Sequence, residues 1–438
     1  MKGINKAQKE DARRLLQCLT VAARPLLVEE LAELLAFDFQ ATSDGGIPAL
    51  RADWRWNDEE QAVLSTCSSL IAIVRDGDAR VVQFSHFSVK EYLTSRRLAS
   101  SGEDASRFYV DLNAAHAILA RACLGTLLRL DEPPGNSGPK GFPLVEYAAR
   151  HWVEHAQFED VSSRVQNGMD DLFDASKPYF SAWLRVHDID EVWNPFFVKK
   201  DDCVGSPLYY AAFCGFHDLA DRLIMKHPDQ VKALGGYVVA PLPAALSKRH
   251  FRVADLLWKH GAVVDVRDGN GRTPLHAAGR TGSVDIIRWL LNHGANPRTQ
   301  SNKRRTPLHQ AAYASDLGAV QVLLEHKQDI NLIDDYGDTP LHDVLSRVYP
   351  SPKGNVVEIV RRLLEHGADP NIVRTGSGST PLHKASADGS LEVARLLLSY
   401  GANIDKKDGM GVTPFQVALS RGHDEIMKLL LEHGAVPP

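Results

Sequence analysis

The sequence lacks the features that mark membrane, secreted and nucleic-acid-binding proteins. No apolar run in its 438 residues reaches the roughly 18 residues of a membrane span, and the first residues form no apolar signal core. Lysine and arginine number 50 against 55 aspartates and glutamates, which gives a formal net charge of −5. The composition therefore gives no reason to expect nucleic acid or a membrane as a partner.

Cysteine is scarce, and its placement argues against a disulfide framework. The five cysteines are odd in number and scattered, and none forms a C-x-x-C pair: Cys18, Cys67, Cys123, Cys203 and Cys214. This pattern predicts reduced thiols in an intracellular protein. We expect a cytoplasmic location, with a nuclear location as the alternative, and the length favours two or three domains.

A nucleotide-binding P-loop is also missing. No G-x-x-x-x-G-K-[ST] motif occurs, and the glycines and lysine of residues 135–141 have the wrong spacing and lack a strand–helix context. The P-loop supplies the lysine for the phosphates and the hydroxyl for Mg²⁺, so without it nothing is expected to hold ATP. The sequence therefore predicts no cofactor.

A repeated motif dominates the second half of the chain. The tetrapeptide T-P-L-H begins at residues 273, 306, 339 and 380, with variants at 206, 240 and 413, and most steps are 33 residues. Thr273 suits a helix N-cap, and Pro274 suits the first helical position, which needs no N–H. Gly294 suits the left-handed residue that stops the second helix. Each repeat therefore predicts a pair of helices.

These residues resemble the ankyrin repeat over about 200–438. We number seven repeats from the starts near residues 202, 236, 269, 302, 335, 376 and 409. The resemblance implies paired helices with β-turn fingers, a concave face made of fingers and first helices, and a non-catalytic protein–protein interaction scaffold with an unknown protein partner. Eight histidines belong to the repeats and are expected to be structural: His276, His309, His342 and His383 in the motif, and His260, His293, His366 and His433 at the ends of second helices.

Two repeats depart from the pattern. Eight extra residues separate 339 from 380, and we assign them to residues 346–355, as either an insertion on a binding face or a neutral surface loop. Repeat 4 has Arg304 and Lys327 where the finger glycine and the stop glycine belong. A residue with a side chain in a left-handed position costs about 1 kcal/mol. Repeat 4 is therefore either a weak point or adapted to a ligand.

The fingers and first helices of repeats 3 to 5 carry the candidate binding residues. Between residues 267 and 305, eight lysines and arginines stand against two aspartates, and the next finger, residues 334–338, is acidic with a central tyrosine. Arginine and aromatic residues are typical interface anchors. The alternative is a solvated charged rim with buried aromatics. The candidates are Asn270, Arg272, Arg280, Asn302, Lys303, Arg305, Tyr313, Tyr336 and Asp338.

Residues 1–100 predict a winged helix: three helices, a hairpin turning at Asp76-Gly77-Asp78, and a fourth helix. Pro25 introduces the second predicted helix, and a capping box of Ser88 and Glu91 starts the fourth near Val89. The third helix is the one that enters the major groove in DNA readers, but here it opens with Asp58, Glu59 and Glu60. Phosphate contacts need lysine and arginine, so we predict no DNA binding.

This region resembles the winged helix that follows the NACHT module in fungal NLR-like (STAND) signalling NTPases. Residues 23–38, 64–74 and 84–95 carry the resemblance, which continues through a helical segment at 101–199. In that family the histidine of the last motif contacts the nucleotide β-phosphate, which by position is His86. With no P-loop here, His86 is either structural or waits for a NACHT module on another chain. The second reading makes the chain the regulatory part of a NACHT-type NTPase whose nucleotide-binding module lies elsewhere or is missing.

One motif argues for catalysis. His151, Glu154 and His155 match H-x-x-E-H, in which two histidines grip zinc and the glutamate acts as base. We expect both histidines on one flank of an amphipathic helix whose Trp152 faces the core, with no third ligand, and we find no G-x-S-x-G elbow. The sequence therefore predicts a non-enzyme with no bound metal, and zinc hydrolysis stays a remote alternative. We expect residues 101–199 to pack on the first repeat and cap it.

Overall fold

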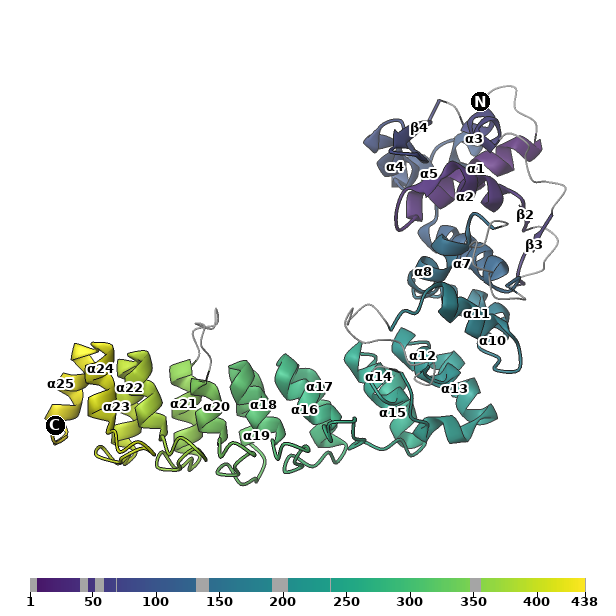
Figure 1. Cartoon of the computed structure of the whole chain (residues 1–438). Helices are drawn as coiled ribbons and strands as arrows, with labels where there is room; N and C mark the ends of the chain where they lie inside the picture. The colour runs from purple at the N-terminus through teal and green to yellow at the C-terminus, as the bar shows by residue number, and fades with distance from the viewer. Residues whose placement is uncertain are drawn as a thin grey trace. The chain divides into compact units, whose positions relative to one another are not determined.

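The computed structural model describes residues 6–39, 46–51, 59–67, 69–130, 142–190, 204–236, 238–346 and 356–437. The chain divides into two compact units, Met1–Tyr237 and Val238–Pro438 (Figure 1). The first repeat lies in the first unit and the other repeats lie in the second. The predicted boundaries near residues 100 and 200 remain predictions.

The N-terminal part of the first unit has the order of a winged helix. Three helices precede the hairpin and one follows it: α1 (Lys6–Val21), α2 (Val28–Leu35), α3 (Glu59–Cys67), β4 (Ile71–Asp76), β5 (Ala79–Phe84) and α4 (Phe87–Leu93). Its core contains Leu15, Leu31 and Val82, all at most 1% exposed. The sequence-based fold class is confirmed for this part.

Short strands were missed by the sequence reasoning. Leu26–Leu27 does not begin a helix but forms β1, which pairs antiparallel with β5 and gives the order β1-β5-β4. β2 (Phe37–Asp38) pairs antiparallel with β3 (Ala49–Leu50). Two-residue strands carry no readable alternation, so only the partner strand reveals them.

A helical segment follows and packs against the first repeat. Its helices are α5 (Arg96–Ala99), α6 (Glu103–Ser106), α7 (Leu112–Leu127), α8 (Val145–Ala156), α9 (Val161–Arg164), α10 (Gln166–Leu172) and α11 (Tyr179–Val186). Repeat 1 contributes α12 (Pro207–Cys214), α13 (His217–Lys226) and the 3-10 helix η4 (Pro228–Lys232).

Aromatic rings and two aspartates join the helical segment to repeat 1. The fully buried Trp152 of α8 stacks on Phe216 with ring centroids 5.5 Å apart. The hydroxyl of Tyr209 donates to Asp190 Oδ2 at 2.6 Å, and that of Tyr210 donates to Asp188 Oδ1 at 3.0 Å. These contacts cover apolar surface of the first helix pair, as a capping segment must.

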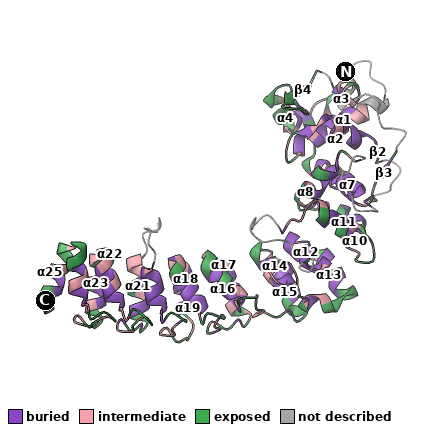
Figure 2. Ribbon diagram, in the orientation of Figure 1, coloured by how far each residue is buried: buried purple, intermediate pink, exposed green. Residues whose placement is uncertain are grey.

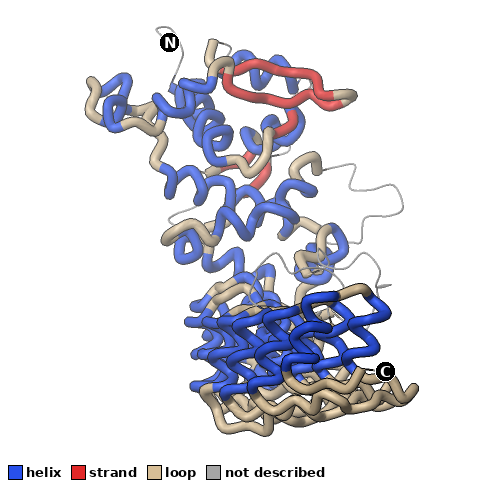
Figure 3. Tube along the Cα trace, turned by 90° about the vertical axis from the view of Figure 1, so that its left-hand side faces the viewer, coloured by secondary structure: helices blue, strands red, loops and turns tan. Residues whose placement is uncertain are grey.

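The second unit is a stack of helix pairs with its loops along one edge (Figure 3). Buried residues line the faces where neighbouring helices meet (Figure 2). The pairs are α14 (Pro241–Ser247) and α15 (Phe251–Lys259), α16 (Pro274–Thr281) and α17 (Val284–Asn292), α18 (Pro307–Ala314) and α19 (Leu317–Leu324), α20 (Pro340–Leu345) and α21 (Val356–Glu365), α22 (Pro381–Asp388) and α23 (Leu391–Ser399), α24 (Pro414–Arg421) and α25 (Asp424–Glu432).

The motif histidine connects one repeat to the next. In repeat 4 the backbone N–H of Thr306 donates to His309 Nδ1 at 3.1 Å, and His309 Nε2 donates to the carbonyl of Asp338 at 3.0 Å. His276 and His383 make the equivalent bonds to the carbonyls of Arg305 and Val412. The prediction of a structural role is confirmed for these histidines.

The finger glycine of repeat 4 is replaced without a change in backbone conformation. Its counterparts Gly271, Gly337 and Gly411 have φ of 70°, 76° and 79°, and Arg304 keeps a φ of 57°. The prediction that this arginine occupies a left-handed position is confirmed. Ser315, which ends α18, has a φ of 53°, where Gly282 ends the equivalent helix of repeat 3.

Lys327, unlike Arg304, does not keep the positive φ of the glycine that it replaces. It is absent from the positive-φ residues, although Gly294 at the equivalent position has a φ of 89°. In repeat 3 the N–H of Ala295 closes the helix end by donating to the carbonyl of Leu290. In repeat 4 the side-chain amide of Gln328 donates instead to the carbonyl of Leu323 at 2.6 Å. A side chain therefore satisfies this carbonyl, and the left-handed turn is not needed.

One of the eight extra residues of repeats 5 and 6 lies in a finger. The finger of repeat 6 closes from Arg374 N to Ser379 O, one residue wider than the closure from Asp334 N to Asp338 O in repeat 5. The prediction had placed all eight in residues 346–355. Most of that segment, 347–355, lies outside the described residues.

Candidate functional site

The predicted binding residues fall into two classes, and Arg305 belongs to the internal one. Its guanidinium pairs with the buried Asp343, its Nε lies 3.7 Å from Asp334 Oδ2, and its Cζ lies 5.3 Å from the centre of the Tyr313 ring. The side chain therefore bridges repeats 4 and 5 inside the array. Burial raises the pKa of Asp343 to about 7 against the opposing effect of Arg305.

Asp338 is internal as well. It is 5% exposed, and its two carboxylate oxygens pair with Arg374 Nε at 2.6 Å and Nη2 at 2.8 Å. This two-point pair joins the fingers of repeats 5 and 6. Burial raises the pKa of Asp338 against the opposing effect of Arg374.

Asn270 and Asn302 shape the fingers. The backbone N–H of Asn302 donates to the carbonyl of Asn270 at 2.9 Å, and its side-chain amide donates to the carbonyl of Gly269 at 3.3 Å. Both residues remain exposed. Their main observed role is to connect the fingers of repeats 3 and 4.

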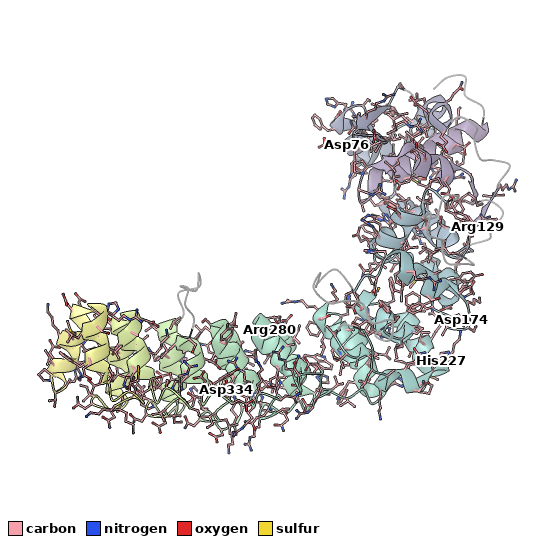
Figure 4. All side chains as sticks on the ribbon, viewed as in Figure 1. Asp76, Arg129, Asp174, His227, Arg280 and Asp334 are labelled. Atoms are coloured by element: carbon pink, nitrogen blue, oxygen red, sulfur yellow. The ribbon has the colours of Figure 1, made fainter. Side chains whose placement is uncertain are left out.

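The remaining basic candidates are displayed. Arg280 and Lys303 are exposed and Arg272 is half-buried. Arg304, which was not among the candidates, is exposed as well. None of the four makes an ion pair or side-chain hydrogen bond with the described residues. Arg280 lies near the ends of the helices opposite the loops, whereas Asp334 lies among the loops (Figure 4). Tyr313 and Tyr336 expose 42% and 57% of their surface.

The two aspartates among these cations are already engaged. Asp268 Oδ1 accepts the backbone N–H groups of Asn270 and Arg272, both at 2.8 Å. Asp285 Oδ2 pairs with Arg249 at 2.9 Å. We call Arg272, Arg280, Lys303 and Arg304 the free cation set, because no nearby carboxylate pairs with them.

His86 is the N-cap of its own helix. α4 begins at Phe87, and His86 Nδ1 accepts the N–H of Ser88 at 3.2 Å, so the predicted Ser88–Glu91 capping box is wrong. With Nδ1 accepting, the neutral ring carries its proton on the exposed Nε2. The neighbouring Phe87 is 74% exposed.

His155 is part of the core. It is 1% exposed, Tyr147 Oη lies 2.8 Å from its Nε2, and His116 Nδ1 lies 2.9 Å from its Nδ1. Tyr147 Oη also accepts the N–H of Ala23, so both ring nitrogens of His155 lie in a hydrogen-bonded group inside the core. The expected placement beside His151 on a flank was wrong for His155.

This hydrogen bonding leaves no ring nitrogen of His155 for a metal. His151 faces Glu154 at 3.4 Å instead, and burial lowers the pKa of His155 to about 3. No cluster of three or more metal-ligating side chains occurs in the part of the chain that the structure describes. His116 was missed because nothing in the sequence relates two histidines 39 residues apart.

The acidic start of α3 also has an internal partner. Arg80 of β5 pairs with Glu60 at 3.2 Å, lies 3.6 Å from Glu59 and contacts Glu29 of α2. These charges hold two helices to the hairpin. Asp58 lies outside the described residues.

Comparison with known proteins identifies both parts. Models for ankyrin repeats match residues 208–301 and 347–437 (three copies) and residues 290–342 (many copies). A model for the winged helix domain of GPI inositol-deacylase matches residues 1–105. The chain carries ankyrin repeats behind a winged helix domain. Ankyrin repeats are typically interaction modules without catalytic activity.

The curated relatives match part of their length. "Azaphilone pigments biosynthesis cluster protein L" of Monascus ruber is 30% identical over 276 residues, which cover 58% of this chain and 56% of that protein. "Potassium channel AKT1" of Oryza sativa subsp. indica is 44% identical over 52 residues, 12% of this chain and 6% of the channel. The chain thus spans about half of the first relative and a small part of the second.

A solved ankyrin repeat domain, that of Bcl-3, "a unique member of the IkappaB protein family", is also similar. It is 29% identical, with a TM-score of 0.45, and the match covers 51% of this chain and 99% of that domain. None of the described helices is both long and apolar enough to cross a membrane.

Proposed function

We propose that the chain is a non-catalytic scaffold that binds a partner protein on the concave surface of its ankyrin repeats, at repeats 3 and 4. The observation that carries the proposal is the free cation set together with the half-exposed Tyr313 of the same two repeats. Cations without intramolecular partners are ready to pair with a protein surface of opposite charge. An exposed tyrosine in the same two repeats supplies an aromatic contact of the kind found at interface centres.

The test compares capture of partners by charge-reversed variants of the whole chain. We expect R280E/K303E/R304E to lose the proteins that the wild-type chain retains from native lysate, quantified by mass spectrometry. Arg305 stays unchanged, since its substitution would disturb Asp343.

A matched control reverses three exposed lysines in repeats 6 and 7. K406E/K407E/K428E changes the net charge by the same amount but leaves repeats 3 and 4 intact. Retention of partners by this control, with loss by the first variant, supports the surface. Equal retention by both variants contradicts the proposal.

The second candidate is a regulatory part for a NACHT-type NTPase on another chain. The observation that favours it is the exposed face of α4, where His86 presents its Nε2–H beside Phe87 and where Tyr92 is 49% exposed. An outward N–H can donate to a phosphate, and a 74% exposed phenylalanine is an unusual solvent-facing residue.

This candidate is tested by binding of the whole chain to a purified NACHT-type NTPase. Loss of binding in F87S and H86A, with retention in R280E/K303E/R304E, would assign the interaction to the winged helix. Absence of binding by the wild-type chain would reject it.

A further inference from the structure

The basic residues of repeats 3 and 4 separate into cations whose side chains are bonded within the array and cations whose side chains are not bonded to the described residues. Arg267 donates to the carbonyls of Gly271 and Gln300, Arg298 donates to the carbonyl of Lys327, and Arg305 pairs with Asp343. Arg288 is exposed on the second helix α17. The free cation set therefore contains what remains at the fingers and first helices.

The displayed residues lie side by side in adjacent repeats. Arg280 on α16 and Tyr313 on α18 occupy equivalent positions, and so do the tip residues Asn270 and Lys303 of the two fingers. The fingers are joined directly by the bond from Asn302 N to Asn270 O at 2.9 Å. One ligand segment that crosses from repeat 3 to repeat 4 therefore meets cations at the fingers and at the helix tops.

We infer that the partner held by repeats 3 and 4 presents an acidic peptide segment to the free cation set. This inference rests on the proposed function and names the chemistry of its partner. Asp268 accepts backbone N–H groups and Asp285 pairs with Arg249, so neither pairs with the free cation set, and an acidic segment from a partner can supply the opposite charge.

The finger of repeat 5 limits the length of that segment. Asp335 is exposed next to the finger of repeat 4, and its N–H donates to the carbonyl of Lys303. A continuous phosphate backbone that follows the fingers past repeat 4 meets this negative charge, whereas a short acidic peptide ends before it. The charge pattern therefore favours a peptide over a nucleic acid.

Arg304 permits a test in which binding and stability change in opposite directions. Its φ of 57° suits glycine, so R304G relieves backbone strain while it removes one cation. We expect R304G to weaken acidic-peptide binding about threefold, which corresponds to one exposed charge pair. The thermal midpoint should stay equal or rise by about 1–3 °C.

Ser315 of the same repeat supplies the matched control. It has a φ of 53°, is fully buried and lies at the end of α18. S315G relieves the same kind of strain without removing a charge. It should therefore shift the thermal midpoint as R304G does and leave peptide binding unchanged.

The experiment measures fluorescence anisotropy of a labelled polyglutamate peptide with the whole chain at low salt. We expect binding that weakens as salt is added, a loss of at least about tenfold in R280E/K303E/R304E, and no loss in K406E/K407E/K428E. Labelled polythymidylate is titrated with the chain in a parallel experiment, so that the two affinities can be compared. Tighter binding of polythymidylate than of polyglutamate overturns the inference in favour of nucleic acid.

Two further outcomes separate this inference from the proposed function. If polyglutamate does not bind but partner capture is lost in R280E/K303E/R304E, the surface is a binding site and the acidic-peptide class is wrong. If neither peptide binding nor capture depends on these cations, both the inference and the proposed surface are wrong.

Discussion

Replacing His309 by glutamine should make the protein less sensitive to acid. His309 is 0% exposed, and burial lowers its pKa from about 6.5 to about 4. The unfolded chain therefore binds a proton on this ring between pH 6.5 and 4, while the folded chain does not. Because the unfolded state then binds more protons, the free energy of unfolding falls as the pH falls through this window.

The magnitude follows from the two pKa values. Because the pKa of His309 is about 6.5 in the unfolded chain and about 4 in the folded chain, acid lowers the free energy of unfolding of the wild type by roughly 3 kcal/mol. Most of this loss has occurred by about pH 4.5. Glutamine does not titrate, and repeat 7 already has glutamine at the position of the motif histidine. There the N–H of Thr413 donates to Gln416 Oε1 at 2.9 Å. H309Q loses the bond from His309 Nε2 to the carbonyl of Asp338, at a cost of about 1 kcal/mol.

The difference between wild type and H309Q should therefore change sign with pH. We expect the variant to be less stable by about 1 kcal/mol near pH 7.5 and more stable by about 1.5 kcal/mol near pH 4.5. Urea denaturation at several pH values gives both free energies, and subtraction removes the titration of all other groups.

The control for this experiment is H260Q, at the exposed end of α15. It makes the same replacement at an exposed histidine and serves as the reference for H309Q. A pH-independent difference for H309Q would refute the reasoning, since the acid sensitivity would then not come from burial of this imidazole.

Three further predictions concern stability and metal binding. R305M leaves the carboxylate of Asp343 buried without its cation, so the free energy of unfolding in urea should fall by about 3–5 kcal/mol. Most of this loss should be recovered in R305M/D343L, and an unchanged urea midpoint in R305M would contradict the role of the pair. H86A removes the N-cap of α4 and should cost about 1 kcal/mol, which H86N should restore, whereas equal melting of all three proteins would show that the cap is irrelevant. Excess Zn²⁺ should not raise the thermal midpoint, because both ring nitrogens of His155 are hydrogen-bonded, and a clear rise would reopen the zinc site.

Local sequence signals account for most of the fold. Thr-Pro pairs mark the start of the first helix in repeats 3 to 7, since capping and the fixed φ of proline act within one turn. The left-handed position of Arg304 was also predictable, because the neighbouring repeats have glycine there. Periodicity carries this information from one repeat to the next.

Contacts between distant residues account for what the sequence did not predict. Arg305 is separated from Asp343 by 38 residues, so the sequence does not reveal that the two side chains pair. The lysines and arginines around Arg305 instead suggested an exposed binding residue. The Tyr147–His155–His116 hydrogen bonds likewise join two helices. Gln328 replaced a backbone bond with a side-chain bond, which no repeat pattern indicates.

Repeat 4 shows how a departure from a repeat pattern is to be interpreted. Where Lys327 replaces glycine, Gln328 satisfies the helix end, and the cation of Arg305 is paired with the buried Asp343. The change at Lys327 is therefore compensated inside the protein, and the charge of Arg305 already has a partner there. Arg304 keeps the strained φ of the glycine that it replaces, and its exposed guanidinium meets no carboxylate among the described residues. Ser315 is strained too, and nothing in the structure explains it, but it is buried and cannot contact a partner. Arg304 is therefore the residue of repeat 4 that we propose for recognition, because it is an exposed cation in a strained conformation whose side chain makes no ion pair or hydrogen bond among the described residues.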